Sequence, residues 1–321
     1  MNISDEKAKG IMQYLRGDTE GAGVTSDEVE DWLQGLKESL GLFEDEYLDE
    51  ENAYPFGGDI YEYLDLAQSA SSRRQRKVYL EKARFLDPEN FDVLYFLCLY
   101  EHPKSVEALP YLEELLEREK AKLVEKGYYE KAKGRFNHFR ETQPYIRGLM
   151  GYMVLTEDCG LMRKTAAVGE EILMLCSQDM EEDGEEFEET CSKLICVYAF
   201  LEEKDKMLQL LERMDEEIQD SESCLLPLAI LYYKLGEWDR ASQYVKDLQK
   251  ENRHFKKFVS LYLSEQVEDM MEEMDDDYSF EEAEPGTLNA LFAMYQSNTL
   301  IFITNTGFFA WAKGQLGRRK K

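Results

Sequence analysis

Five side chains that could take part in binding or catalysis lie close together in the sequence, around a chain turn expected at Pro144. Ionisable groups gathered in one enclosed pocket could bind a small molecule or perform acid–base chemistry. One alternative for this protein is therefore a ligand-binding protein or an enzyme with a pocket near residues 135–147. In the other interpretation, Glu141 and Arg147 are architectural and bridge a long helix to the next element. The five residues are His138, Arg140, Glu141, Tyr145 and Arg147.

The rest of the sequence has no local pattern typical of catalysis, cofactor binding or metal binding. The three histidines, His102, His138 and His254, are far apart, whereas zinc needs three or four ligands in fixed geometry. The six cysteines form no CxxC pair, which indicates a reducing compartment. Glycine-rich phosphate loops and nucleophile motifs are also missing. We therefore expect a non-enzymatic protein with no catalytic residues, no cofactor and no metal.

Apolar residues recur at helical spacing along most of the chain, which predicts an all-α fold. A pattern also repeats after 34 residues, in two segments that each read as a helix, a turn and a second helix. Gly236 is the expected turn residue of the later segment because glycine tolerates left-handed geometry. Units of this kind cannot bury their apolar faces alone and must stack. The matching positions are Cys191, Leu194, Tyr198, Met207, Leu211 and Met214, followed by Leu225, Leu228, Tyr232, Ala241, Val245 and Leu248.

Three stretches carry a resemblance to a known repeat family. YYKLGEWDRA (232–241) resembles the centre of a tetratricopeptide unit, and VYLEKARFLDPEN (78–90) resembles the end of one, with Ala83 as the small packing residue. GRFNHFRETQPYIRG (134–148) is similar to bacterial tetratricopeptide proteins related to the suppressor of tumorigenicity 7 family. The resemblance covers about residues 57–260 and implies a right-handed α-solenoid of about five helix pairs with capping helices.

A solenoid of this kind offers one recurring functional surface. The first helices of successive units line a concave groove in which an extended peptide or a partner helix can lie. We therefore predict a scaffold that binds a protein or peptide, although some groove residues could instead pack against neighbouring units. The predicted groove residues are Ser192, Cys196, Phe200, Leu226, Ile230, Tyr233 and Lys234.

The charge of the chain restricts its partners. With 38 Lys and Arg against 67 Asp and Glu, the formal net charge is −29 in 321 residues. Contact with nucleic-acid phosphates needs a cationic surface, so we expect no nucleic-acid partner and favour a basic protein or peptide. A third possibility is that the acidic face imitates nucleic acid. The sequence leaves the identity of the partner and the oligomeric state open.

The sequence divides into three sections. Residues 1–55 contain an amphipathic helix, either a cap or a free arm, and an acidic linker; residues 56–260 contain the repeats. Residues 261–321 contain an acidic loop and two expected capping helices, which begin near Pro285-Gly286 and at Thr306. Thr287–Ala312 has no charged residue, but its amides and hydroxyl groups argue against a membrane span. The charged N-terminus lacks a secretory signal, and we expect a cytoplasmic protein.

Overall fold

The computed structural model describes residues 59–177, 184–214, 216–272 and 283–317, and every regular element in these ranges is a helix. The all-α prediction is therefore confirmed for this part of the chain. The helices belong to two compact units, which divide between Glu119 and Lys120. This division lies inside the section 56–260 that the sequence predicted as one row of repeats. The N-terminal helix predicted within residues 1–55 lies outside the described residues.

The described part of the first unit begins at a capping box. Asp59 Oδ1 accepts hydrogen bonds from the backbone N–H groups of Tyr61 and Glu62, and Glu62 Oε2 accepts one from the N–H of Asp59. The helix Arg73–Leu86 ends directly before Asp87-Pro88, because proline disfavours helical geometry at the preceding residue. The helices are α3 (Ile60–Gln68), α4 (Arg73–Leu86), α5 (Phe91–Glu101) and α6 (Ser105–Glu125), the last of which continues into the second unit.

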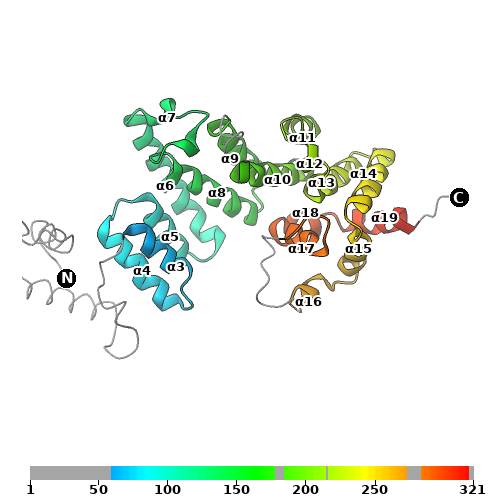
Figure 1. Ribbon diagram of the computed structural model, residues 1–321, viewed down its shortest axis with the longest axis horizontal. Helices are drawn as coiled ribbons and strands as arrows, with labels where there is room; N and C mark the ends of the chain where they lie inside the picture. The colour runs from blue at the N-terminus through cyan, green and yellow to red at the C-terminus, as the bar shows by residue number, and fades with distance from the viewer. Residues whose placement is uncertain (1–58, 178–183, 215, 273–282, 318–321) are drawn as a thin grey trace, which may run out of the picture. The chain divides into compact units, whose positions relative to one another are not determined.

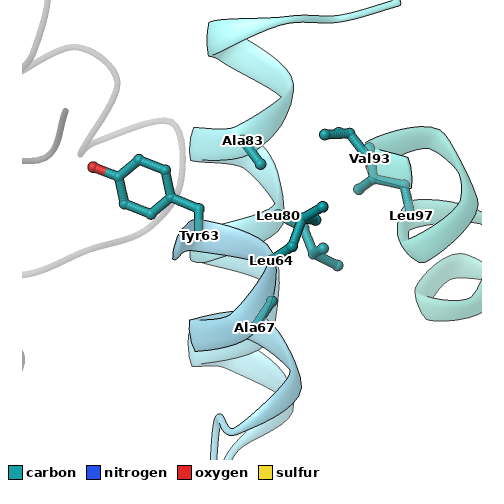
Figure 2. Close-up of a cluster of buried hydrophobic side chains, with 7 residues drawn as sticks. All are labelled: Tyr63, Leu64, Ala67, Leu80, Ala83, Val93 and Leu97. Carbon is teal, nitrogen blue, oxygen red and sulfur yellow. The ribbon is translucent and has the colours of Figure 1, made fainter. Parts of the chain in front are cut away.

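The core of the first unit lies between α3, α4 and α5. Figure 2 shows Leu64 and Leu80 side by side where α3 and α4 cross, with Val93 and Leu97 of α5 facing them. Ala83 is fully buried in the same cluster, which confirms the sequence prediction that it is a packing residue. α3 and α4 each have one apolar face, whereas α5 is apolar on almost every side, so the three must pack together to remove these surfaces from water.

The second unit contains the remaining helices, coloured from green to red in Figure 1. Most are arranged as hairpins, in which a helix packs against the next one along the chain. They are α7 (Tyr128–Lys131), η2 (Phe136–His138), α8 (Gln143–Asp158), α9 (Met162–Leu175), α10 (Gly184–Leu201), α11 (Lys204–Leu211), α12 (Glu216–Gln219), α13 (Glu222–Lys234), α14 (Trp238–Glu251), α15 (Phe255–Leu263), α16 (Val267–Glu272), α17 (Leu288–Ser297), α18 (Thr299–Ile303) and α19 (Thr306–Gly317).

Four hairpins of the second unit share one type of turn. A residue one or two positions after the end of the first helix is left-handed in each, at Gly160, Glu202, Gly236 and Glu265, with φ between 57° and 75°. The next N–H donates to the carbonyl group five residues earlier, over 2.8–3.0 Å. This Schellman arrangement satisfies the last carbonyl groups of the first helix and reverses the chain. Gly236 therefore has the role that the sequence assigned to it.

The 34-residue recurrence of the sequence is also a recurrence of the structure. Glu202 and Gly236 are the left-handed residues of their hairpins, and the second helices begin at Lys204 and Trp238, again 34 positions apart. All twelve apolar positions that the sequence matched are buried, with exposed fractions of 7% or less. A cation also lies over the matched tyrosine in both hairpins: Lys206 over Tyr198 and Arg240 over Tyr232.

The turn glycines allow a direct test of backbone strain. We expect Gly236→Ala to lower the free energy of unfolding by about 1 kcal/mol, because a Cβ at φ +75° clashes with the backbone. Nothing lies within 4 Å of the added methyl group, so packing contributes little. Gly314→Ala, in the interior of α19, is the matched control and is expected to stabilise by about 0.5–1 kcal/mol. Denaturant unfolding of both variants would measure these values, and equal signs would contradict the prediction.

One further glycine sets the spacing between hairpins. A Cβ at Gly169 in α9 would lie 2.8 Å from Leu194 of α10 and from Met153 of α8. Because the neighbouring side chains are buried, they have little room to move away. Gly169 therefore permits α8, α9 and α10 to pack closely.

The C-terminal segment differs from its prediction. Three helices form where two were expected, because Asn298 ends α17 and begins α18. α18 contacts α10, α17 contacts α13 and α15, and α19 contacts α14 and α15. The three helices therefore lie along several successive hairpins of the second unit. They do not cap only the last hairpin, as the sequence predicted. Within the described residues, no helix combines the length and apolar character needed to cross a lipid bilayer.

Candidate functional site

A cleft of about 580 Å³ opens in the second unit. Its walls are the C-terminal end of α8, the N-terminal parts of α10 and α13, and α17 on the opposite side. The first three are the first helices of consecutive hairpins. The cleft therefore lies on the kind of surface that the sequence predicted for partner binding, with α17 as an additional wall.

A buried ion pair joins three walls of the cleft. Lys193 Nζ on α10 donates to Glu157 Oε2 on α8 over 2.5 Å and to the backbone oxygen of Ser297 on α17 over 3.0 Å. The two charged side chains are only 13% and 9% exposed. Removal of charges from water is unfavourable, so the pair depends on this close geometry.

A second buried carboxylate holds the turn that leads into α17. Glu222, at the start of α13, is 5% exposed, and its Oε1 accepts hydrogen bonds from the N–H of Gly286 (3.0 Å) and from Asn252 Nδ2 (3.4 Å). The same Asn252 nitrogen donates to the backbone oxygen of Thr287 over 2.7 Å. Thr287 then caps α17 by accepting from the N–H of Ala290. α17 is thus anchored at both ends by side chains of other helices.

Negative charge dominates the cleft. Among the residues that the structure describes, four carboxylates line it, and the only basic side chain in the lining is Lys193, which is already paired with Glu157. Much of the remaining wall consists of serine and alanine side chains. Such a surface can accept hydrogen bonds and attract cations. The carboxylates belong to Glu157, Asp158, Glu189 and Glu222.

The structure distributes the predicted groove residues over three environments. Ser192 lines the cleft. Cys196, Leu226 and Ile230 are only 3%, 0% and 0% exposed, and they belong to the core instead of lining an open groove. Contacts of α10 with α18 and of α13 with α17 explain this difference, because the chain covers part of its own first helices.

The remaining three groove residues make contacts within the protein. Lys234 Nζ donates to the carbonyl groups of Ala199 and Phe200, at 3.2 and 2.5 Å, and therefore caps the C-terminal end of α10. Its ammonium group also lies 5.5 Å from the centre of the Phe200 ring. Tyr233 packs edge-on against Trp238 and against Phe308 of α19. These contacts give all three residues a structural role.

The residues of the alternative pocket do not form an enclosed site. His138, Arg140, Glu141 and Arg147 are exposed, whereas Tyr145 is buried. Glu141 accepts a hydrogen bond from Tyr128 at the surface, over 3.2 Å. Pro144 is the second residue of α8 and not a chain turn, and of the five side chains only Tyr145 faces the interior.

Tyr145 belongs to a cluster that sequence analysis missed. Glu171 Oε1 accepts from Lys120 Nζ at 2.6 Å, from Tyr145 at 3.2 Å and from Tyr129 at 3.3 Å. Burial and the nearby Glu171 carboxylate raise the pKa of Tyr145 above its ordinary value. The phenol therefore stays protonated at neutral pH and donates its hydrogen bond to the Glu171 carboxylate. No local spacing signals it, because its members lie up to 51 positions apart.

The sequence pattern gives little indication of the charged residues that line the cleft. Lys193 is the only charged residue in CSKLICVYAF (191–200). A single charge in such an apolar stretch indicates that the side chain is buried with a partner of opposite charge. Glu222 gives no such signal, because acidic residues are common in the first turn of helices. Among the described residues, no group of three or more His, Cys, Asp and Glu side chains is placed to hold a metal ion.

The cysteines offer a prediction that bears on nucleophilic chemistry. Burial raises the pKa of the Cys98 and Cys224 thiols to about 11, and Cys176, Cys191 and Cys196 are buried as well. Cys159 alone is partly exposed. Thiolate is the reactive form, so at pH 8 we expect one thiol per folded chain to react rapidly with an aromatic disulfide reagent, and six after unfolding. Rapid reaction of two or more thiols in the folded protein would contradict this.

We found no match to the chain among protein-family models, curated proteins or solved structures.

Proposed function

We propose that the protein is a non-enzymatic scaffold that binds a protein or peptide through the inner face of a tetratricopeptide-like, right-handed solenoid. The first helices of three consecutive hairpins, α8, α10 and α13, would supply this face. Two observations support the repeat interpretation: the shared turn at four hairpins, and the 34-residue correspondence between α10–α11 and α13–α14. The proposed relation to bacterial tetratricopeptide proteins related to the suppressor of tumorigenicity 7 family rests on the sequence stretches alone.

The observation that carries the proposal is the acidic cleft bordered by these three first helices. Bound peptides in repeat proteins lie along first helices, and a cleft of about 580 Å³ can hold several side chains. The net charge of −29 would favour rapid, salt-sensitive encounter with a basic partner. The proposed binding surface is narrower than the groove predicted from sequence, and of those residues only Ser192 lines it.

The experiment is a pull-down from cells of the source organism with the full chain, at low and moderate salt. Ser192→Trp should fill the cleft and lose the partner that the wild-type chain retains. Gln243→Trp is the matched control, because Gln243 is exposed on α14 and does not line the cleft. Equal retention of the partner by both variants would place binding elsewhere. Recovery of no partner at either salt concentration would count against the scaffold function.

A further inference from the structure

We infer that the outward face of α4, opposite the buried Leu80 and Ala83, binds the acidic run EDEYLDEE (44–51) of the same chain. The run lies outside the described residues, so its sequence and its attachment to α3 enter the argument. Three independent features support the assignment: the charge of α4, a lysine on α4 that lacks an acceptor, and the place where the chain enters the first unit.

The charges of the two segments are complementary. α4 has six basic residues and one acidic residue, Glu81, in a chain of net charge −29. Arg73, Lys77 and Arg84 are exposed and, at positions i, i+4 and i+11, follow one stripe along the helix. None of these three forms an ion pair with a described residue. Residues 44–51 contain six carboxylates and no cation, which is the charge that this stripe attracts.

A second cationic edge borders the same face of α4. Lys82 Nζ lies 5.5 Å from the centre of the Tyr63 ring on α3. Figure 2 shows that Tyr63 points away from Val93 of α5. Arg73, by contrast, lies 5.1 Å from the centre of the Tyr100 ring on α5. Cations therefore stand on both sides of the outward face, and an acidic segment that crosses it obliquely can contact both edges.

The ammonium group of Lys82 has no hydrogen-bond acceptor among the described residues. Its contacts there are with the rings of Tyr63 and Tyr79, whose centres lie 5.5 and 5.4 Å away. Burial lowers the pKa of Lys82, because the charged form loses contact with water. A carboxylate beside this ammonium group would supply charge-assisted hydrogen bonds and stabilise the cation.

The chain enters the first unit beside α4. Lys82 lies next to Tyr63, and Arg76 Nε donates to the backbone oxygen of Ala67 over 3.0 Å, so α3 and α4 are antiparallel. The start of α3 is therefore close to the C-terminal half of α4. Residues 52–58, which join the acidic run to the capping box of α3, span at most about 25 Å. Because α4 rises by only about 21 Å, the run can reach the whole outward face.

The tether also favours this occupant over an external polyanion. A short linker holds the acidic run near α4 at an effective concentration on the order of millimolar. A nucleic acid would have to displace the run and approach a chain of net charge −29. The chain's own carboxylates are therefore the favoured partner of this basic face.

The test measures competition between the tethered run and a free copy of it. A fluorescein-labelled peptide of residues 43–52 is titrated with the full chain at low salt, and its fluorescence anisotropy is recorded. An opened variant carries a neutralised run. We expect it to bind the peptide at least about tenfold more tightly than the wild-type chain, in which the run occupies the face. Equal affinity of the two chains would overturn the inference. The substitutions are Asp45→Asn, Glu46→Gln, Asp49→Asn and Glu50→Gln.

A matched variant separates this competition from the overall charge. It removes four exposed carboxylates outside the run and leaves the run intact, so it should bind the peptide as weakly as the wild-type chain does. A gain equal to that of the opened variant would show only a general loss of repulsion and would overturn the inference. The substitutions are Glu114→Gln, Glu117→Gln, Glu125→Gln and Glu130→Gln.

Two lysines of α4 locate the site. In the opened variant, Lys77→Gln with Lys82→Gln should weaken peptide binding by about fivefold, with folding verified by circular dichroism. Lys126→Gln with Lys133→Gln removes two exposed cations elsewhere and should have no effect. Equal losses for the two pairs would overturn the inference. Failure of the opened variant to bind the peptide would also overturn it, and binding of an oligonucleotide instead would assign the face to nucleic acid.

Cross-linking distinguishes the same chain from a second copy. A carbodiimide joins a carboxylate to an amine that it contacts, and mass spectrometry identifies the linked residues. In an equal mixture of unlabelled and heavy-nitrogen chains, we expect links from residues 44–51 to Lys77 or Lys82 within one isotope only. Links between the isotopes would assign the face to a second copy and overturn the same-chain assignment. Absence of any link from the run to α4 would overturn the inference.

Discussion

Replacement of Lys193 by Met is expected to lower the free energy of unfolding by about 3–5 kcal/mol, the cost of an uncompensated buried charge. In the native protein, Lys193 Nζ lies 2.5 Å from Glu157 Oε2, and both side chains are largely shielded from solvent. The variant would leave the Glu157 carboxylate buried without its cation and would also remove the donor to the backbone oxygen of Ser297. The contact between α10 and α17 should loosen first.

A matched control separates the effect of burial from that of ion pairing itself. Lys206 pairs with Glu170 over 2.7 Å, but these side chains are 50% and 42% exposed. Solvent screening reduces the value of such pairs, so Lys206→Met should cost about 1 kcal/mol or less. The double variant Glu157→Leu with Lys193→Met should recover much of the loss, because no charge remains buried. Urea unfolding measures all three, and equal losses for Lys193→Met and Lys206→Met would contradict the prediction.

Replacement of Phe302 by Ala is expected to cost about 3–5 kcal/mol, which is typical of a large aromatic side chain removed from a core. Phe302 is fully buried on α18, and its ring centre lies 5.3–6.2 Å from those of Phe258, Tyr262, Tyr295 and Phe309. These rings come from α15, α17 and α19, so the truncation would open a cavity among three neighbouring helices.

Phe302→Leu is the conservative control and should cost less than about 1.5 kcal/mol, because it retains most of the side-chain volume. If α17–α19 are an integral part of the second unit, the Ala variant should unfold that unit in one transition at lower denaturant concentration. A separate early transition, or a loss below 1 kcal/mol, would show that the C-terminal helices fold independently of the hairpins.

The cleft shows why the predicted groove was only partly correct. Helical periodicity places Cys196, Leu226 and Ile230 on apolar faces, but it does not distinguish a face covered by another helix from one that is open to a ligand. Here the covering helices come from much later in the chain: the hydrogen bond from Lys193 to Ser297 spans 104 positions, and that from Gly286 to Glu222 spans 64. No repeat period predicts such contacts.

The sequence by itself determined the helical character, the 34-residue hairpins and the left-handed turn at Gly236, because these depend on local spacing and backbone sterics. It also determined which twelve apolar positions of the repeat are buried, since one face of each helix had to leave water. Only the tertiary structure decided that α17 and α18 cover part of the first helices and leave an acidic cleft. Tertiary structure also paired Lys193 with Glu157, because long-range packing brings together groups whose separation in sequence carries no periodic signal.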